Sequence, residues 1–363
     1  MGALRGGRRV ALAGLGFLSV RVLVVGSVLG QPAGGVRRHN AELLPRLARR
    51  LGEEGGSLAV LVGTGGLGFE LPGSVERLET TVPPAPPLVR ATLEGRWLRR
   101  LLGEAAESGR PFDLIHTAHH PVPRHLPVPH SLMVHDLRAL SLEHSPFSRR
   151  LFARQILGRG VEGAAVVEVV SEATRAELLR AFRLDPGDVH LVPNGVDHLE
   201  VLPRSAGADA PLLVLEALAL DGSLPDVRVV GAAKGDARDW LERRAAELGL
   251  AGRIRLDGPA DEDDLPGLYA GAACVVCPSR LEGFGLVPAE ALRAGAPVAV
   301  SDIPAHREVC GEAVPSFDPG DARACARAIR RALEVAPATA PGLAWDDAAA
   351  RLHAAWSAGL GRA

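Results

Sequence analysis

Short apolar runs alternate with amphipathic, helix-like segments along nearly all of this chain. In the first half, the runs that predict strands are 21–29, 58–63, 75–82, 112–117, 129–136, 165–170 and 189–193, and the segments that predict helices are 35–51, 88–108, 146–160 and 172–182. Strands that are apolar throughout their length are typical of a parallel sheet covered by helices on both faces. The sequence therefore predicts an α/β fold.

The second half repeats the alternation. Strands are expected at 227–231, 253–256, 273–277 and 297–300, and helices at 237–248, 264–271, 286–294, 321–334 and about 345–358. With 363 residues, of which 47% are hydrophobic, the chain is long enough for two domains with cores of their own. Doubly wound sheets bind ligands beyond the carboxyl ends of their strands, so a site is expected in a cleft between the domains.

The domain boundary is expected just after "LVPNGVD" (191–197), where polar and proline-rich sequence begins. Helical spacing of Trp345, Ala349, Leu352 and Trp356 predicts that the last helix packs against a partner surface on the first domain. The predicted parts are an extension at 1–20, Rossmann-like doubly wound domains at 21–193 and 194–343, and a C-terminal helix at 344–363.

The ends and the charge of the chain bear on its compartment. Residues 1–20 contain arginines and a short apolar stretch, but no A-x-A cleavage site follows. We expect a disordered or loosely packed extension there, with a processed signal as the alternative. Four cysteines, scattered apart from Cys274 and Cys277, predict no disulfide framework and fit a reducing cytoplasm. The net charge of −2 gives no reason to expect nucleic acid as a partner.

Two glutamates, Glu282 and Glu290, bracket a Gly-Phe-Gly turn where a strand gives way to a helix. Gly283 and Gly285 let the backbone approach a ligand closely, and the free N–H groups of the helix that follows suit a diphosphate. Glu290 can accept hydrogen bonds from the hydroxyls of a ribose, and Glu282 can reach a sugar beyond the diphosphate. Either glutamate alone is more typical of a solvated surface, but together with the turn they predict a nucleotide-sugar site.

The stretch "PSRLEGFGLVPAEALRAGAPVAVSD" (278–302) resembles the E-x7-E motif of the family 4 retaining glycosyltransferases, which have the two-Rossmann GT-B fold. Other stretches match the same family in order. "GQPAGGVRRHNAELLPRLA" resembles its Gly-rich loop and first helix, "LMVHDLRAL" its strand ending in His-Asp, and "VEVVSEATRAELLRAF" with "LVPNGVD" the entry to its interdomain hinge. The resemblance covers most of the chain, and it is the order and spacing of the motifs that make it specific.

This resemblance implies a hexosyltransferase that moves a sugar from a nucleoside diphosphate sugar to a glycan, lipid or small-molecule acceptor with retention. The first domain would hold the acceptor, and the second the nucleotide sugar. His135 and Glu282 would be the catalytic residues, and the donor would be bound by Gly34, Gly35, Gly283, Phe284, Gly285, Leu286 and Glu290. Neither a metal nor another cofactor is expected.

The chain departs from the family just after the hinge. There the family has a strand that ends in a Gly-Arg…Lys segment, whose cations neutralise the leaving diphosphate. Here Arg204 is the only cation between Asp197 and Arg228, and Lys234 follows later in "GAAKGD". The missing pair leaves a second function open, a glycosyltransferase-like binding or scaffold module with weak or no turnover.

The same departure bears on the second sheet. Segment 212–218 has a proline before it, Leu, Ala and Glu within it and Asp-Gly shortly after it, so we expect a helix. The neighbouring strands would then pair directly in a sheet that is one strand short. The alternative is that 212–218 enters the sheet as a strand.

Four further features have both a structural and a chemical interpretation. Cys274 and Cys277 form C-x-x-C on a strand, where residues i and i+3 face opposite sides, so we expect core cysteines. "DEDD" (261–264) is expected to cap a helix rather than bind a metal.

The histidine-rich segment is expected to be an acceptor-facing loop, with a zinc site as the alternative; its histidines are His116, His119, His120 and His125. Helix 88–108 has a basic side, formed by Arg90, Arg96, Trp97, Arg99 and Arg100. We expect a solvated face there, with contact to an anionic acceptor or to the inner face of the membrane as the alternative.

Overall fold

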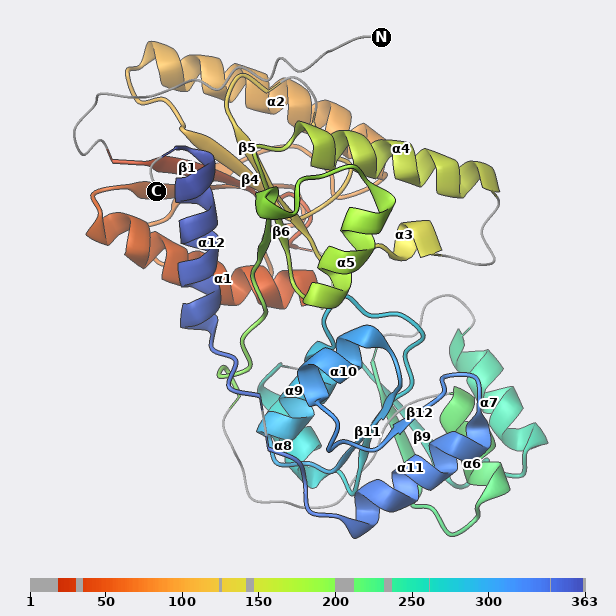
Figure 1. Cartoon of the computed structure of the whole chain (residues 1–363). Helices are drawn as coiled ribbons and strands as arrows, with labels where there is room; N and C mark the ends of the chain where they lie inside the picture. Colours follow the sequence, from red (N-terminus) through yellow and green to blue (C-terminus); the bar gives the residue numbers. More distant parts are fainter. Residues whose placement is uncertain are drawn as a thin grey trace.

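The computed structural model describes residues 19–30, 35–123, 126–141, 147–199, 212–231, 237–260, 262–339 and 341–361. Seven parallel strands form the N-terminal sheet, in the order β3-β2-β1-β4-β5-β6-β7 (Figure 1). They are β1 (Arg21–Val25), β2 (Ser57–Val62), β3 (Glu76–Glu79), β4 (Leu114–Thr117), β5 (His130–Val134), β6 (Val166–Val169) and β7 (Val189–Leu191). The α/β class predicted from the alternating pattern is confirmed.

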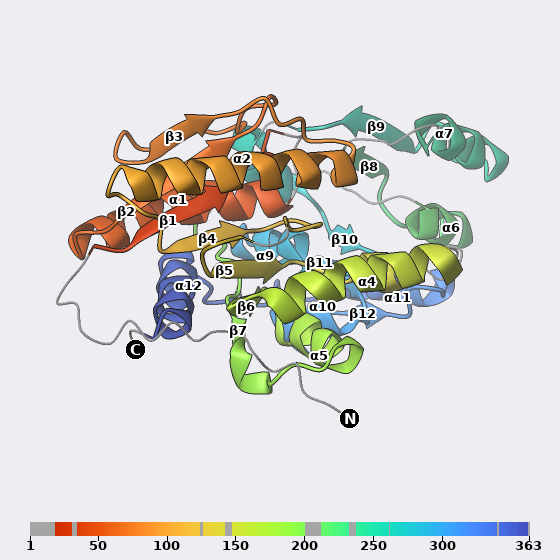
Figure 2. The ribbon, with the colours of Figure 1, turned by 90° about the horizontal axis from the view of Figure 1, so that it is seen from above.

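Helices cover both faces of this sheet (Figure 2). They are α1 (Gly35–Glu53), α2 (Pro87–Glu107), α3 (Arg138–Ser141), α4 (Phe147–Gly163), α5 (Glu172–Ala181) and the short η1 (Pro186–Asp188). Successive residues of β1 point to opposite faces: Val22 and Val24 pack in the core under α1, and Leu23 and Val25 in the core under α2. Both faces of β1 are thus buried, which is why its sequence is apolar throughout.

The C-terminal domain contains the remaining elements except the last helix. Its strands are β8 (Val227–Val230), β9 (Ile254–Gly258), β10 (Val275–Cys277), β11 (Val298–Ser301) and β12 (Ser316–Phe317). Its helices are α6 (Leu212–Leu220), α7 (Ala237–Glu247), η2 (Glu262–Asp264), α8 (Leu265–Gly271), α9 (Leu286–Arg293), α10 (Pro304–Cys310) and α11 (Ala322–Glu334).

The predicted helix at 212–218 is confirmed as α6, but the predicted direct pairing of its neighbouring strands is wrong. Within the described residues, β8 pairs only with β9, and β10, β11 and β12 form a separate parallel sheet. Side chains of α6, α11 and both strands line an apolar space between β8 and β10, among them Val214, Val227, Val276 and Ile329. Pairing would require the strands to approach to about 4.8 Å, which would displace these packed side chains.

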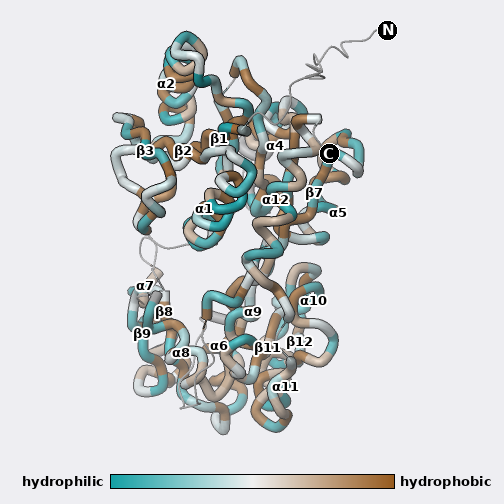
Figure 3. The backbone as a smooth tube through the Cα atoms, turned by 90° about the vertical axis from the view of Figure 1, so that its left-hand side faces the viewer, coloured by the Kyte–Doolittle hydropathy of each residue, from teal (hydrophilic) through white to brown (hydrophobic). Residues whose placement is uncertain are grey.

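The last helix, α12 (Trp345–Gly359), leaves the C-terminal domain and packs against α1, β6 and β7 of the N-terminal sheet. Figures 1 and 3 show it running along the N-terminal domain, beyond the point where the chain crosses between the domains. Trp345 and Trp356 are both buried. A β-carbon on Gly359 would overlap the side chain of Val166, so the end of α12 lies directly against β6.

No helix in the described ranges is both long and apolar enough to cross a bilayer.

Candidate functional site

The Gly-Phe-Gly turn connects β10 to α9 and is held by its own residues. Gly285 caps α9 with φ of 91°, in the left-handed region that favours glycine. Phe284 is buried in the main hydrophobic core, and its packing there holds the turn in place. The first N–H groups of α9, which begins at Leu286, have no partner within the helix. Free N–H groups beside a turn of this kind are suited to a phosphate.

Gly283 brings the turn into contact with the N-terminal domain. A β-carbon at this position would overlap the carbonyl oxygen of His135, the residue that follows β5. The carbonyl of Gly283 also accepts hydrogen bonds from Ser171 Oγ and, at 2.9 Å, from Thr174 Oγ1 of α5. The two domains therefore meet through the backbone of the predicted donor loop.

A second contact between the domains lies beside the first. The carboxylate of Glu308, on α10, accepts hydrogen bonds from the backbone N–H of Glu172 at 2.8 Å and of Ala173 at 2.9 Å. These N–H groups begin α5, where a carboxylate also interacts favourably with the helix dipole. The N-terminus of α5 is thus capped by the other domain.

Glu282 lies next to Gly283, at the exposed edge of the contact between the two domains. Its carboxylate pairs with Arg138 of α3 at 2.7 Å and accepts a hydrogen bond from Ser279 Oγ at 2.7 Å. Arg138 also lies 3.6 Å from Asp136, which follows His135 in the chain. The side chain of Glu282 is 29% exposed, so the carboxylate can meet a ligand from solvent.

Glu290 lies one turn into α9 and is only 4% exposed. Tyr269 of α8 donates its hydroxyl hydrogen to one carboxylate oxygen at 2.7 Å, and His198 Nε2 lies 3.2 Å from the other. His198 follows the hinge sequence "NGVD" and also contacts Trp345 of α12. A carboxylate has about four acceptor positions, so Glu290 can still accept further hydrogen bonds.

His135 lies beside a second buried histidine, His39 of α1. Their rings are 4.7 Å apart and nearly perpendicular, and His39 Nδ1 lies 2.7 Å from Asn194 Oδ1. Burial lowers the pKa of His39 to about 4, and burial, then the neighbouring histidines, lower the pKa of His135 well below its ordinary value. Both rings are therefore neutral at pH 7, and Nε2 of each has no partner among the described residues.

Of the predicted donor-binding residues, Gly283 to Leu286 form one turn that leads into α9, and the structure places His135 in contact with Gly283. Gly35 begins α1, with open space where a β-carbon would stand, whereas Gly34 lies outside the described residues. Sequence reasoning missed the residues that hold these groups, which are Arg138, Ser171, Thr174, His198, Tyr269 and Glu308. Arg138 follows the His-Asp pair by two positions and could have been found there. The others gave no local signal.

A buried polar cluster lies where β1 and β4 end. Glu94 of α2 accepts a hydrogen bond from Ser27 Oγ, and it faces Arg90 Nε at 3.1 Å and His119 Nε2 at 3.3 Å. Burial would raise the pKa of Glu94, but His119, Ser27 and Arg90 together outweigh burial and lower it. Arg90 is 4% exposed, so its expected place on a solvated basic face is wrong. In the strand order, β1 is followed by β2 toward one edge of the sheet, and β4 by β5 toward the other edge. Doubly wound sheets bind ligands at the point where the strand order reverses in this way.

The cysteine pair and most of the candidate metal ligands can be located in the structure. Cys274 and Cys277 are buried in two different core clusters, so the expectation of core cysteines is confirmed. In the described parts of the chain, no group of three or more His, Cys, Asp or Glu could hold a metal ion. His125 and Asp261 lie outside those parts.

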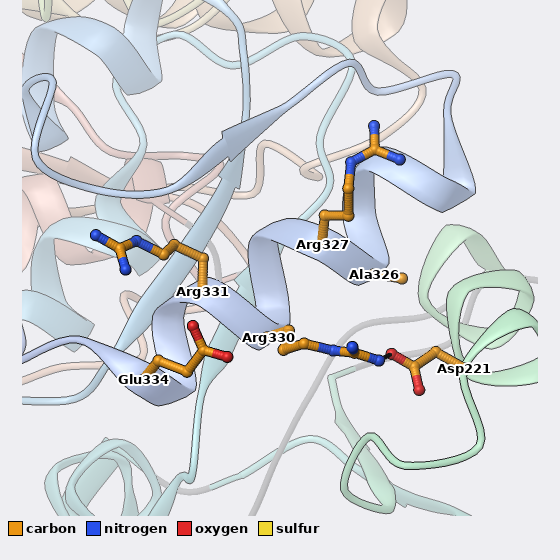
Figure 4. A pocket seen from close by; sticks show the side chains of 6 residues that line it. All are labelled: Asp221, Ala326, Arg327, Arg330, Arg331 and Glu334. Carbon is orange, nitrogen blue, oxygen red and sulfur yellow. Dashed lines mark hydrogen bonds and ion pairs between the residues drawn. The ribbon is translucent and has the colours of Figure 1, made fainter.

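A surface depression of about 220 Å³ lies between the end of α6 and α11, and Figure 4 shows the residues that line it. Arg330 reaches Asp221 and pairs with it, whereas Arg327 and Arg331 point elsewhere. The rest of the lining is Ala326 and Glu334. Because none of the predicted site residues contributes, this depression is separate from the Glu282–Glu290 site.

Two family models match the chain in succession. "Glycosyltransferase Family 4" matches residues 33–199, and "Glycosyl transferases group 1" matches residues 204–339. The D-inositol 3-phosphate glycosyltransferase of Geodermatophilus obscurus is 32% identical over 305 residues, which cover 72% of this chain and 65% of that protein. The MMP alpha-(1->4)-mannosyltransferase of Mycolicibacterium hassiacum is 29% identical over 215 residues, which cover 55% and 51%. The chain thus spans about half to two thirds of the length of these relatives.

Solved structures share the fold. Sucrose-phosphate synthase from Thermosynechococcus elongatus superimposes with a TM-score of 0.69 at 20% identity, over 94% of this chain and 97% of that one. HepE of Anabaena, in complex with UDP and glucose, gives 0.66 at 18% identity, over 93% and 100%. At these identities the likeness concerns the fold alone, and it confirms the predicted two-domain GT-B class. With both family models matched in the expected order, the chain belongs to the family 4 glycosyltransferases of the GT-B fold.

Proposed function

We propose that this chain is a retaining glycosyltransferase that moves a hexosyl group from a nucleoside diphosphate sugar to an acceptor. The observation that carries the proposal is the meeting of the Gly283 turn with His135 of the other domain, with Glu282 and Glu290 on either side of the turn. Family membership supports it, since the relatives named above are glycosyltransferases.

The donor is proposed to lie along the turn and the start of α9. The free N–H groups of α9 would bind the diphosphate, and Glu290 would accept hydrogen bonds from the ribose hydroxyls. Phe284 and Gly285 would line the path, with Gly34 and Gly35 approaching from the N-terminal domain. Such a donor matches the UDP and glucose in the HepE structure, which supports the nucleotide class without naming the base.

The transferred sugar is proposed to lie between Glu282 and His135. Glu282 would accept hydrogen bonds from its hydroxyls. His135 is neutral at pH 7, and its Nε2 is buried without a partner in the described residues, so this nitrogen would bind a sugar hydroxyl once the residues that cover it move aside. The acceptor would approach along the N-terminal domain, where the buried Glu94 cluster lies at the ends of the neighbouring strands β1 and β4.

Charge at the leaving diphosphate is the weak part of the site. Arg204 and Lys234 lie outside the described residues. Arg138 is a cation near the turn, but its guanidinium pairs with Glu282 and so is not free to pair with the diphosphate. Losing one charged donor in a transition state commonly costs a factor of about 100 to 1,000 in rate. We therefore propose slow turnover, and the second candidate function is a donor-binding module with no turnover.

We further propose that the protein works in the cytoplasm, with peripheral contact to the inner face of the membrane. Four large apolar side chains on α2 and α4 are between 45% and 52% exposed, namely Leu88, Val89, Leu151 and Phe152. Exposed apolar side chains beside basic ones are typical of surfaces that lie on a bilayer. A lipid-linked acceptor would be reached from such a surface.

The test is a transfer assay with UDP-, GDP- and ADP-sugars and a panel of glycan, lipid and small-molecule acceptors. The expected result is one glycoside whose anomeric configuration, read by NMR, equals that of the donor. Inversion would overturn retention. Donor binding without product from any acceptor would favour the binding module.

A further inference from the structure

Both carboxylate oxygens of Glu290 face a partner. Tyr269 donates to Oε2 at 2.7 Å, and His198 Nε2 lies 3.2 Å from Oε1. The side chains of His198 and Glu290 are each 5% exposed. In such surroundings an unsatisfied carboxylate is costly, so these contacts restrict the orientation of Glu290.

A third residue fixes the tautomer of His198. The indole Nε1–H of Trp345 lies 2.9 Å from His198 Nδ1, and an indole nitrogen can only donate. Nδ1 must therefore carry a lone pair, so the proton of the neutral ring is on Nε2 and points to Glu290. The hydrogen bonds therefore have one direction: Trp345 donates to His198, and His198 donates to Glu290.

Trp345 is itself fixed by both domains. It is the first residue of α12, which packs on α1 of the N-terminal domain, and it is fully buried. Its backbone N–H donates to Asp197 at 2.8 Å, and a β-carbon on Gly195 would overlap its backbone. The N–H of Val196 donates to the carbonyl of Leu343 at 3.0 Å. The two chain segments that cross between the domains are thus hydrogen-bonded to each other beside His198.

We propose that His198 and Trp345 are positioning residues for the donor. They orient Glu290 and make donor affinity depend on the docking of α12 against the N-terminal domain. This inference rests on the proposed role of Glu290 in binding the nucleotide. It adds that affinity for the donor depends on the arrangement of the two domains, because that arrangement sets the orientation of the Glu290 carboxylate.

Helix α12 offers a matched control. Trp356 is also buried and also donates its indole N–H, but to Ser131 of β5 at 2.9 Å, away from Glu290. Trp345→Phe and Trp356→Phe remove the same donor from two places on one helix. Calorimetric titration with UDP, GDP and ADP should show affinity about tenfold weaker in Trp345→Phe, because one hydrogen bond in a buried network is lost. Trp356→Phe should match the wild type.

Substitutions at His198 separate positioning from packing. His198→Gln keeps one donor and one acceptor and should retain most of the affinity, whereas His198→Phe keeps a ring but neither hydrogen bond and should weaken affinity at least as much as Trp345→Phe. In a Glu290→Gln background, Trp345→Phe should have little further effect. Wild-type affinity in both Trp345→Phe and His198→Phe, with weakened binding in Glu290→Ala, would overturn the inference alone. A wild-type protein that binds none of the three nucleotides would overturn the proposed function and the inference with it.

A measurement on the unaltered protein covers the case in which these variants fail to fold. In NMR spectra of protein with ¹⁵N-labelled histidine, His198 should carry its proton on Nε2 and none on Nδ1. A proton on Nδ1 would exclude the hydrogen bond from Trp345 and overturn the inference.

Discussion

The carbonyl oxygen of His135 lies against the α-carbon of Gly283, so closely that the smallest side chain would overlap it. His135 directly follows β5 of the N-terminal sheet, and Gly283 begins the Gly-Phe-Gly turn of the C-terminal domain. A displacement of the turn would therefore change its contact with the N-terminal domain, at the place where the proposed donor and acceptor sides meet.

Gly283→Ala tests this contact. The added β-carbon would force the turn away from His135 and weaken its hydrogen bonds to Ser171 and Thr174. We expect turnover to fall about 100-fold, the cost of misplacing a site by about 1 Å. Gly163→Ala is the control, because a β-carbon at the end of α4 meets nothing within 4 Å. Equal rates in the two variants would show that the contact is not needed.

Glu290→Ala should weaken binding of the preferred nucleoside diphosphate by roughly 1.5–3 kcal/mol, the usual worth of hydrogen bonds to a charged group. Glu290→Gln should cost less, because the amide oxygen still accepts a hydrogen bond. Calorimetry on both variants measures the difference. Unchanged affinity in Glu290→Ala would exclude a role at the ribose.

Glu282→Ala should lower turnover by a factor of about 100 to 1,000 while changing stability little. The ion pair with Arg138 is half exposed, and exposed pairs contribute about 0–1 kcal/mol. Initial rates and melting temperatures should be measured together, with Arg100→Ala as control, since its pair with Glu104 is exposed and lies on α2. A large drop in melting temperature for Glu282→Ala would mark Glu282 as structural.

The stability of the fold should depend on pH through Glu168 of β6. Burial raises the pKa of this carboxyl from 4.5 to about 8, and the hydrogen bond from Ser131 offsets only part of that effect. The folded protein therefore holds a proton that the unfolded chain releases, and the resulting stability is complete below pH 4.5 and lost as pH rises through about 8. Buried histidines such as His39 act in the opposite direction, but only below pH 6.5.

Urea unfolding between about pH 7 and 8 tests this residue, since the histidines of the unfolded chain are then mostly neutral and its cysteines, with an ordinary pKa of 9.0, still mostly hold their protons. The wild type should lose stability over that range, and Glu168→Gln should show a flatter profile. Parallel profiles for the two proteins would mean that Glu168 is ionised in the folded state.

The order of strands and helices could be predicted because both patterns are local: buried strands are apolar throughout, and helices repeat every 3.6 residues. α10 and β12, with seven and two residues, are too short for such a signal. The turn between β10 and α9 could be predicted because its glycines and glutamates lie close together in sequence. The residues that hold it could not. Arg138 and Glu282 are 144 positions apart, and Trp345 and His198 are 147 apart, so only the folded chain joins them.

The split of the second sheet was missed for a related reason. The sequence predicts that β8 and β10 pair directly with each other, in place of the strand that the family has between them. Whether two strands pair depends on what packs beneath them, and here Val214 of α6 and Ile329 of α11 line the space between them. That competition between backbone pairing and side-chain packing is not visible in either strand alone.

Whether the Glu282–Glu290 site transfers a sugar can be measured as the release of nucleoside diphosphate from UDP-, GDP- and ADP-sugars by the wild type and by Glu282→Ala. We expect the wild type to consume at least one donor, more slowly than the ordinary rate of about ten per second, and Glu282→Ala to consume it far more slowly still. Binding of a donor with no consumption by the wild type, or equal rates in the two proteins, would contradict this expectation.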